Sequence, residues 1–520
     1  MTEIVDLEAG TVFVGGGGAG YACPQDLLLR YANRHGLIAG ATGTGKTVTL
    51  QTLAESFSRA GVPVFMADVK GDLAGISAAG STEGKLHEAF LKRAQQIGVA
   101  LGYQGFPVTF WDVWGERGHP VRTTPAEMGP LLLSRLMGLS DAQEGVLNIA
   151  FRIADEEGLA LLDLADLQAM LVWVGQNARD LSLKYGNVST ASVGAIQRAL
   201  MVLENEGGQL LFGEPALELA DIMRLDASGK GMVNILAAER LMNSPRLYAT
   251  FLLWLMSELF EQLPEVGDPD KPRIAFFFDE AHLLFNDAPP ALVQKIEQVA
   301  RLIRSKGVSL WFISQNPADL PEAVLGQLGN RVQHALRAFT AKDQKALRLA
   351  AQNYRPNPEF DTAEAIQAVG TGEAVTSLLE AKGVPGIVQR TLIRPPMSLL
   401  GPIPDAARAA LNAASPMSLK YGKALDRESA AEILARRTAA TQAAAGEDDL
   451  WRMDRDKGRV PSADPALQIP VETRARQPAS RTSGRDSIAM AFGKSLARQL
   501  GSRTGQALVR GVLGSLFRGK

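Results

Sequence analysis

Cysteine, net charge and long apolar runs are all scarce in this sequence of 520 residues. Its one cysteine, Cys23, excludes an intramolecular disulfide framework and a cysteine-rich metal site, and it is typical of a reducing compartment. The formal net charge of -2 gives the chain as a whole no attraction to nucleic acid or to acidic membranes. These shortages favour a globular protein of the cytoplasm.

The strongest apolar run, FLLWLMSELF at residues 251–260, contains Glu258. It is shorter than the roughly 18 residues that suggest a membrane-spanning helix. We therefore expect a buried helix here and no integral membrane segment. The first ten residues, MTEIVDLEAG, lack the basic and apolar regions of a signal peptide, so the predicted location stays cytoplasmic.

The stretch GATGTGKT at residues 40–47 fits the phosphate-binding loop (P-loop) pattern G-x-x-x-x-G-K-[ST]. An apolar run at 35–40 leads into it and helical spacing follows at 47–61, which is the strand–loop–helix setting that the motif requires. A glycine-rich turn without a ligand is the alternative. Because the glycines let backbone N–H groups close around phosphates, we predict an ATP-binding loop made of Gly40, Ala41, Thr42, Gly43, Thr44, Gly45, Lys46, Thr47 and Val48.

Two side chains of this loop have separate predicted roles. Lys46 is expected to reach the β- and γ-phosphates of ATP, and the Thr47 hydroxyl to ligate Mg²⁺. A second glycine-rich stretch, GGGGAG at residues 15–20, fits no phosphate motif, and we expect a flexible turn there.

An acidic partner for the loop follows the apolar strand of RIAFFFDEAH, residues 273–282. Its continuous apolar run is typical of a strand buried on both faces of a parallel sheet. We expect Asp279 to hold the Mg²⁺ ion and Glu280 to activate the attacking water. Gln315 ends the next predicted strand, GVSLWFISQNP, where it would sense the γ-phosphate or position water. The alternative is a buried strand that ends in acids by chance.

The letters DEAH also suggest a helicase with two tandem nucleotide-fold domains. That assignment needs a second domain with arginine-rich motifs, and no such pattern follows Gln315. One nucleotide-binding core is therefore expected.

The motifs GATGTGKT, VFMADVKGDLAG (64–75), FFFDEAH and ISQNP together resemble the HerA–FtsK superfamily of hexameric pumping ATPases. The second motif is similar to the D-x-K-G-[DE] strand end of HerA-like and conjugative-transfer ATPases. Segments 211–224, 231–242 and 371–385 resemble the YjgR-like branch of the HerA group. The resemblance covers roughly residues 10 to 400. It implies an α/β protein with a RecA-like P-loop NTPase core and a largely parallel sheet, which binds and hydrolyses ATP with Mg²⁺.

The resemblance also implies a homo-oligomer, most simply a hexamer, in which a neighbouring subunit supplies an arginine to the nucleotide. The segment VQKIEQVARLIRSKG, residues 293–307, resembles the place where these ATPases carry that arginine. Arg304 is the first candidate, with Arg301 and Arg331 in reserve. An ordinary solvated helix end is the alternative.

Composition and periodicity divide the chain into five parts. The segment between Lys46 and Asp279 is far longer than a minimal nucleotide core needs, and its surplus has helical spacing that includes a capping box from Ser140 to Gln143. The predicted parts are an N-terminal β/loop segment at 1–34, an ATPase core at 35–114 and 226–400, an inserted helical subdomain at 115–225, an Ala-rich helix and linker at 401–487, and a basic amphipathic segment at 488–520.

The basic C-terminal tail differs in charge from the rest of the chain. Residues 474–520 contain ten lysines and arginines and one acidic residue, Asp486. Such a tail is able to bind the DNA backbone, an acidic membrane surface or the rest of the oligomer. A solvated tail without a function is the alternative. The linker that precedes this tail is expected to begin at about residue 446.

Three functions fit these observations. The preferred one is a ring-forming motor that acts on DNA as a translocase or helicase-like pump. The others are an ATPase that moves or remodels protein, as in secretion, and a nucleotide-gated assembly switch. Stimulation of ATP turnover by DNA separates the first from the other two.

Overall fold

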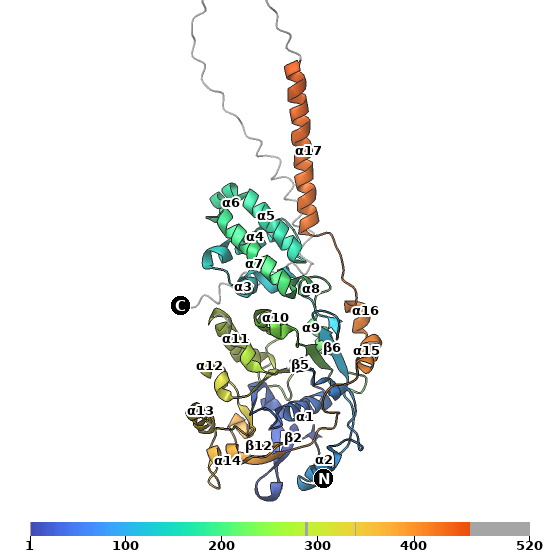
Figure 1. Cartoon of the computed structure of the whole chain (residues 1–520), viewed down its shortest axis with the longest axis vertical. Coiled ribbons are helices and arrows are strands. Elements are labelled where there is room, and N and C mark those ends of the chain that lie inside the picture. Colours follow the sequence, from blue (N-terminus) through green and yellow to red (C-terminus); the bar gives the residue numbers. More distant parts are fainter. Residues whose placement is uncertain (1, 286–289, 339, 458–520) are drawn as a thin grey trace, which may run out of the picture.

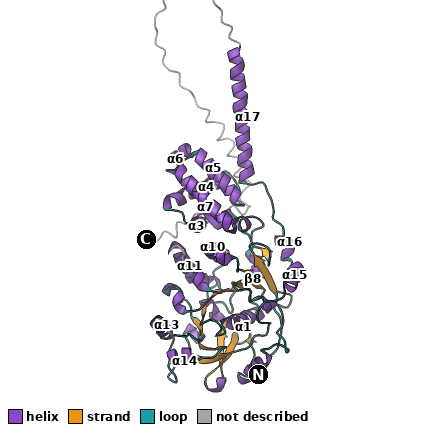
Figure 2. Ribbon diagram, viewed as in Figure 1, coloured by secondary structure: helices purple, strands orange, loops and turns teal. Residues whose placement is uncertain are grey.

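A computed structural model of the chain describes residues 2–285, 290–338 and 340–457. These ranges form one sheet of 13 strands covered by helices (Figures 1 and 2). The strands are β1 (Val5–Asp6), β2 (Thr11–Gly17), β3 (Cys23–Leu28), β4 (Gly36–Ala39), β5 (Val64–Asp68), β6 (Val108–Asp112), β7 (His119–Pro120), β8 (Val233–Ala237), β9 (Ile274–Phe278), β10 (Val308–Ser314), β11 (Asn330–Gln333), β12 (Glu373–Ser377) and β13 (Gln389–Ile393).

The helices follow the chain from α1, directly behind the glycine-rich loop, to α17. They are α1 (Lys46–Arg59), α2 (His87–Gln96), α3 (Pro125–Met137), α4 (Asp141–Glu156), α5 (Leu164–Gln176), α6 (Ala178–Tyr185), α7 (Thr190–Leu203), α8 (Gln209–Leu211), α9 (Leu219–Ile222), α10 (Pro245–Gln262), α11 (Pro290–Leu302), α12 (Glu322–Leu325), α13 (Ala341–Gln352), α14 (Thr362–Ala368), α15 (Asp405–Ala414), α16 (Met417–Tyr421) and α17 (Ala430–Lys457).

The sheet is parallel over most of its width. Its spatial order is β1-β2-β13-β12-β11-β4-β10-β9-β5-β8-β6-β7, with β3 paired to β2. From β11 to β7 the neighbouring strands run parallel, whereas β12, β13, β2, β1 and β3 are added by antiparallel pairing. The predicted α/β class with a largely parallel sheet is confirmed, and the strand–loop–helix order is that of a RecA-like P-loop core.

Strand β9 shows how both faces of the sheet are filled. Ile274, Phe276 and Phe278 pack into the apolar cluster that contains α10, whereas Ala275 and Phe277 pack into the cluster that contains α1. Because side chains alternate across a strand, one apolar run supplies both layers. The strand end that carries Asp279 is therefore fixed from both sides.

A group of helices, α3 to α7, lies between β7 and β8 in the chain and beyond α10 in space (Figure 1). Helix α4 begins at the predicted capping box, in which the side chains of Ser140 and Gln143 bond reciprocally to backbone N–H groups. Helix α10 contains the apolar run at 251–260 and is buried along most of its length, including Glu258. The predicted buried helix is therefore confirmed, while the limits of the inserted subdomain stay a prediction.

Helix α17 packs against α5 and then extends away from the body of the protein (Figure 1). It runs to Lys457, so the linker expected from about residue 446 begins later. Gly446 lies inside α17, but a single glycine costs a helix only about 1 kcal/mol. The first proline after the Ala-rich stretch is Pro461, so no proline interrupts the helix earlier. The rest of the predicted linker and the basic segment 488–520 lie outside the described residues. No helix within the described ranges has the length and apolarity to span a membrane.

The expectation of a flexible turn at residues 15–20 is wrong for its first half, because Gly15, Gly16 and Gly17 belong to β2. A Cβ atom at Gly15 would lie 2.2 Å from the Leu392 carbonyl oxygen, and one at Gly16 would lie 2.1 Å from the Tyr21 carbonyl oxygen. The glycines are therefore required by the close approach of neighbouring backbone. Strand propensity alone gives no sign of such an approach.

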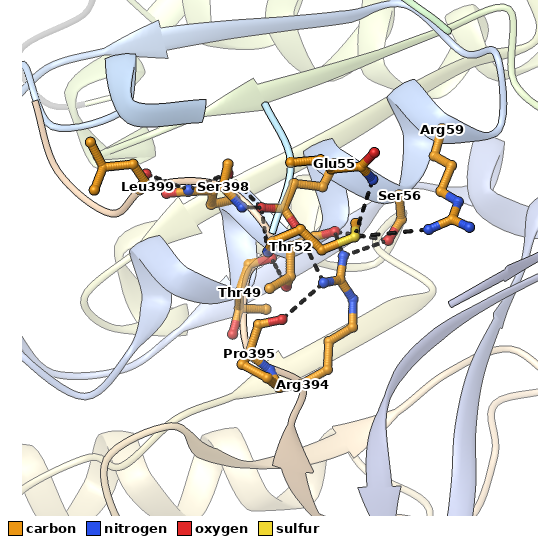
Figure 3. Close-up of polar contacts among 12 residues, drawn as sticks. Thr49, Thr52, Glu55, Ser56, Arg59, Arg394, Pro395, Ser398 and Leu399 are labelled. Carbon is orange, nitrogen blue, oxygen red and sulfur yellow. Dashed lines mark hydrogen bonds and ion pairs between the residues drawn. The ribbon is translucent and has the colours of Figure 1, made fainter. Parts of the chain in front are cut away.

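A buried ion pair joins the chain after β13 to the middle of α1 (Figure 3). Arg394 and Glu55 are 1% and 0% exposed in their side chains, and their Nη1 and Oε2 atoms are 3.1 Å apart. Arg394 also donates to the Thr52 carbonyl at 2.5 Å and to the Ser56 hydroxyl at 2.9 Å. Both Nη atoms of the guanidinium are thus hydrogen-bonded, as a buried charge requires.

The carboxylate of Glu55 is satisfied equally well (Figure 3). Its Oε1 accepts from the Met397 and Ser398 backbone N–H groups at 3.0 and 2.9 Å, and from the Ser398 hydroxyl at 2.5 Å. These hydrogen bonds therefore hold segment 394–398 against α1, the helix that starts at the glycine-rich loop. The helix cannot shift without breaking this network.

Glu55→Gln should destabilise the fold by about 3–5 kcal/mol, because the amide keeps the shape but leaves the Arg394 charge buried without a counter-charge. Urea unfolding at pH 7 measures the effect. The matched control is Glu156→Gln, which removes an exposed carboxylate that pairs with Arg152 and Lys184; its cost should stay below about 1 kcal/mol. Equal losses in the two variants would contradict this account of the buried pair.

Candidate active site

The glycine-rich loop follows β4 at the carboxyl edge of the parallel strands and ends at the first residue of α1. Its backbone is tied to three neighbours: Gly40 N–H donates to the Ser314 carbonyl, Ala41 N–H donates to the Ala335 carbonyl, and the Thr44 carbonyl accepts from Gly372 N–H. Gly45 has a φ of 114°, which favours glycine. The loop is therefore a fixed cradle at the ends of β10, β11 and β12.

Lys46 lies folded over its own loop. Its Nζ donates to the Gly40 carbonyl at 2.7 Å and to the Ala41 carbonyl at 3.1 Å, and the residue is 7% exposed. Burial lowers the pKa of Lys46, and the negative charge of Glu280 opposes this shift. Thr47 and Val48 follow in the first turn of α1, both half-buried. The predicted loop residues thus form one cradle, and the Lys46 ammonium group lies at its centre.

Asp279 and Glu280 directly follow β9, two strands from β4 in the sheet, and both are buried. Glu280 has φ 47° and ψ 49°, a left-handed conformation that is unusual outside glycine and is associated with functional sites. Burial raises the pKa of Asp279 to about 6, with the Lys70 charge opposing the shift. Asp279 is therefore mostly ionised at pH 7, as a cation ligand must be.

Lys70 contacts the second of these acids, although no individual role for it follows from the sequence. Its Nζ lies 2.7 Å from Glu280 Oε1, and His282 Nδ1 lies 3.4 Å from Glu280 Oε2. Burial by itself raises the pKa of Glu280, but the hydrogen bond and charge of Lys70 outweigh it, so the pKa is lowered. His282 and Gln315 act in the same direction as Lys70. The signal for Lys70 lies in the D-x-K-G motif after β5, the strand beside β9.

The turn that carries Lys70 is shaped by Asp68 at the end of β5. Its carboxylate accepts from the backbone N–H groups of Gly71, Asp72 and Leu73 at 2.7, 3.2 and 3.2 Å. Burial raises the pKa of Asp68 to about 6, which these hydrogen bonds oppose. The loop between β5 and the following 3₁₀ helix is thereby closed into a fixed shape that presents Lys70 to β9.

Gln315 follows β10 and is exposed. It lines a cavity of about 420 Å³ together with Ala41 and Thr42 of the glycine-rich loop, and with His282 beyond β9. The structure thus brings together the loop, the acidic strand end and the predicted glutamine at one edge of the sheet.

His334 is a further buried residue beneath the loop, and its place directly after β11 gives no functional signal in the sequence. Its Nδ1 lies 2.9 Å from the Glu373 carbonyl and its Nε2 lies 2.8 Å from the Thr49 hydroxyl. Burial lowers its pKa to about 4, so the ring is neutral at pH 7. A neutral ring that donates through Nδ1 accepts from Thr49 through Nε2. His334 therefore joins α1 to β12 directly under the cradle.

The candidate arginines lie at the other edge of the sheet. Arg304 belongs to the 3₁₀ helix before β10, and Arg331 belongs to the start of β11, so both are at the amino ends of parallel strands. Arg304 pairs with Asp268 at 3.1 Å and its side chain is 42% exposed, whereas Arg331 donates to three backbone carbonyls of its own chain. Arg301, at the end of α11, is exposed. None of the three reaches the loop of its own chain.

A family model described as "Helicase HerA-like C-terminal" matches residues 20–520. This match confirms the resemblance to the HerA–FtsK superfamily that the motifs indicate. None of the curated proteins compared with the chain matches it.

Solved structures with a distant likeness include the plasmid coupling protein TrwB with a non-hydrolysable GTP analogue. It is 13% identical, with 77% of this chain and 94% of that chain covered and a TM-score of 0.47. VirB4 of Thermoanaerobacter pseudethanolicus is 17% identical, with 73% and 95% covered and a TM-score of 0.46. The cytoplasmic domain of the type VII secretion ATPase EccC of Thermomonospora curvata is 16% identical, with 81% and 32% covered and a TM-score of 0.29.

Lys70→Met should move the acid limb of the pH–rate profile of ATP turnover to higher pH. In the wild type the Lys70 ammonium keeps Glu280 ionised to lower pH; without it, burial dominates and the pKa of Glu280 rises. A base is lost when it is protonated, so turnover should begin to fall at a higher pH. Initial rates from about pH 5 to about pH 9 measure this shift.

Two further variants control this experiment. Lys70→Arg keeps the positive charge and should keep the acid limb near its wild-type position. Lys85→Met removes an exposed lysine outside the cluster and should leave the profile unchanged. An acid limb that stays in place in Lys70→Met would show that Lys70 does not control Glu280.

Proposed function

The chain belongs to the HerA-like helicase C-terminal family, and we propose that it is an ATP-hydrolysing ring motor that translocates or unwinds DNA. The main support for this proposal is that Lys46, Lys70 and Glu280 lie together around the glycine-rich loop at one edge of the sheet. A buried carboxylate beside two lysines is suited to activating water next to a phosphate. The family description supports DNA as the substrate.

In this proposal residues 40–48 hold ATP and the Thr47 hydroxyl and Asp279 hold Mg²⁺. Bound ATP–Mg²⁺ would supply the phosphoryl group and a cation that neutralises the phosphate charge. Lys46 exchanges its bonds to the Gly40 and Ala41 carbonyls for bonds to phosphate oxygens. Glu280 takes the proton of the attacking water, and Gln315 positions that water. The fit rests on the fixed cradle of the loop and on the ionised Asp279 beside it.

Arg304 is proposed to complete the site of a neighbouring subunit. The arginines lie at the amino edge of the sheet and the glycine-rich loop lies at the carboxyl edge, so one chain cannot supply both to one nucleotide. A homo-oligomer, most simply a hexamer, brings opposite edges together. A guanidinium that faces the transferred phosphate stabilises charge in the transition state.

The cytoplasmic location indicated by the sequence stays a prediction.

DNA should raise the ATP turnover of the full chain several-fold at low salt. The stimulation should fade as salt increases, because phosphate contacts release counterions on binding. Steady-state rates with duplex DNA, single-stranded DNA and polyglutamate at two salt concentrations measure it. Glu280→Gln should abolish turnover under every condition and so excludes a contaminating ATPase. Equal rates with and without both forms of DNA would favour a protein-moving ATPase or an assembly switch instead.

Arg304→Ala should leave ATP binding nearly intact and reduce turnover by about 10³-fold. Mixed with Glu280→Gln subunits it should regain part of the activity, since each variant damages a different half of a shared site. ATP binding by calorimetry, turnover of the mixture and sedimentation of the assembly measure these effects.

Two neighbouring variants make the assignment of Arg304 specific. Asp268→Asn breaks the ion pair of Arg304 but keeps the guanidinium, so turnover should fall far less. Arg301→Ala removes an exposed arginine at the end of the preceding helix and should be mild. A monomer with full activity, or a mixture with no recovery, would refute a site shared between subunits.

A further inference from the structure

A second cavity, of about 640 Å³, opens at the carboxyl edge of the sheet away from the glycine-rich loop. It is lined by Glu116 and Arg117 from the loop between β6 and β7, and by Asp405, Arg408, Ala409 and Asn412 from α15. Strands β10, β9, β5 and β8 separate β6 from β4. The cavity is therefore distinct from the proposed ATP site.

Arg408 is the unusual member of this lining. It is 4% exposed, and its Nε and Nη2 atoms have no hydrogen-bond partner within the described ranges. Its guanidinium carbon lies 4.7 Å from the ring centre of Phe110, so the group is held against an apolar surface. A buried cation with free donors is unfavourable until an acceptor meets it.

Three of the carboxylates around Arg408 have other partners, and the fourth, Asp405, is exposed. Glu239 pairs with Arg117, and Glu116 pairs with Arg240 at 2.7 Å. Asp68 is occupied by the backbone N–H groups of the turn after β5. Asp405 lines the cavity but is exposed at the start of α15. None of these acids is hydrogen-bonded to the free Nε or Nη2 of Arg408.

We propose that this cavity binds a small oxyanion, a phosphate or carboxylate group, held by Arg408 with Arg117 beside it. A guanidinium presents donors in a plane that matches two oxygens of such a group. The position of the Arg408 guanidinium over the Phe110 ring limits its movement. Two acids, Glu116 and Asp405, also line the cavity, and Glu116 is already paired with Arg240.

Equilibrium dialysis with radiolabelled inorganic phosphate tests the site in the full chain. The glycine-rich loop is first saturated with a non-hydrolysable ATP analogue and Mg²⁺. One saturable phosphate site per chain should remain, and Arg408→Met should weaken it about tenfold or more, the loss expected for charge-assisted hydrogen bonds. Arg198→Met, which removes an exposed arginine on α7, should leave binding unchanged.

Competition by acetate identifies the ligand chemistry. Displacement of phosphate by acetate indicates a site for oxyanions in general, and no displacement indicates a site for phosphate groups. Arg117→Met, a partly exposed position, gives a second variant, and retained binding of the ATP analogue shows that each variant is folded. Absence of a nucleotide-independent phosphate site, or equal binding in wild type and Arg408→Met, would overturn the proposal. DNA plays no part in this assay, so its outcome is independent of the motor function.

Discussion

The glycine-rich loop is held by backbone hydrogen bonds to residues at the ends of three other strands, and the rest of the site depends on that constraint. Its bonds to Ser314, Ala335 and Gly372 fix where the first turn of α1 points. His334 adds a side-chain link from below, and the Arg394–Glu55 pair secures the same helix further along. A cradle for phosphates must be preorganised because ordering it at binding would weaken affinity. Here the sheet itself provides that order.

The parallel sheet also separates the chemistry into two edges. Lys46, Lys70, Asp279, Glu280 and Gln315 all follow carboxyl strand ends, where side chains from different strands converge. The candidate arginines lie at the amino edge, with Arg304 before β10 and Arg331 at the start of β11. In the proposed function a single chain therefore carries all of the hydrolytic site except an arginine, and its own candidate arginines lie at the opposite edge. This division is the physical basis for proposing a ring.

Local sequence features predicted the loop, the acidic strand end and the glutamine strand well, because each depends on residues close together in the chain. The contacts of Lys70 with Glu280 and of His334 with Thr49 join distant segments, and no local pattern encodes them. The contact between Arg408 and Phe110 likewise joins segments that are far apart in the chain. The turn expected at residues 15–20 is wrong in its first half because Gly15 and Gly16 are required by the backbone of Leu392 and Tyr21, which lies outside this stretch. Helix α17 continues past Gly446 because a single glycine weakens a helix without ending it, and its sequence contains no proline.

A structure of the Glu280→Gln variant with ATP and Mg²⁺ tests the central claim most directly. We expect phosphates on residues 40–47, Mg²⁺ on Thr47 and Asp279, and a guanidinium from the amino edge of an adjacent copy within hydrogen-bond distance of the γ-phosphate. Nucleotide bound elsewhere, or bound in an isolated chain with no neighbouring arginine, would contradict it.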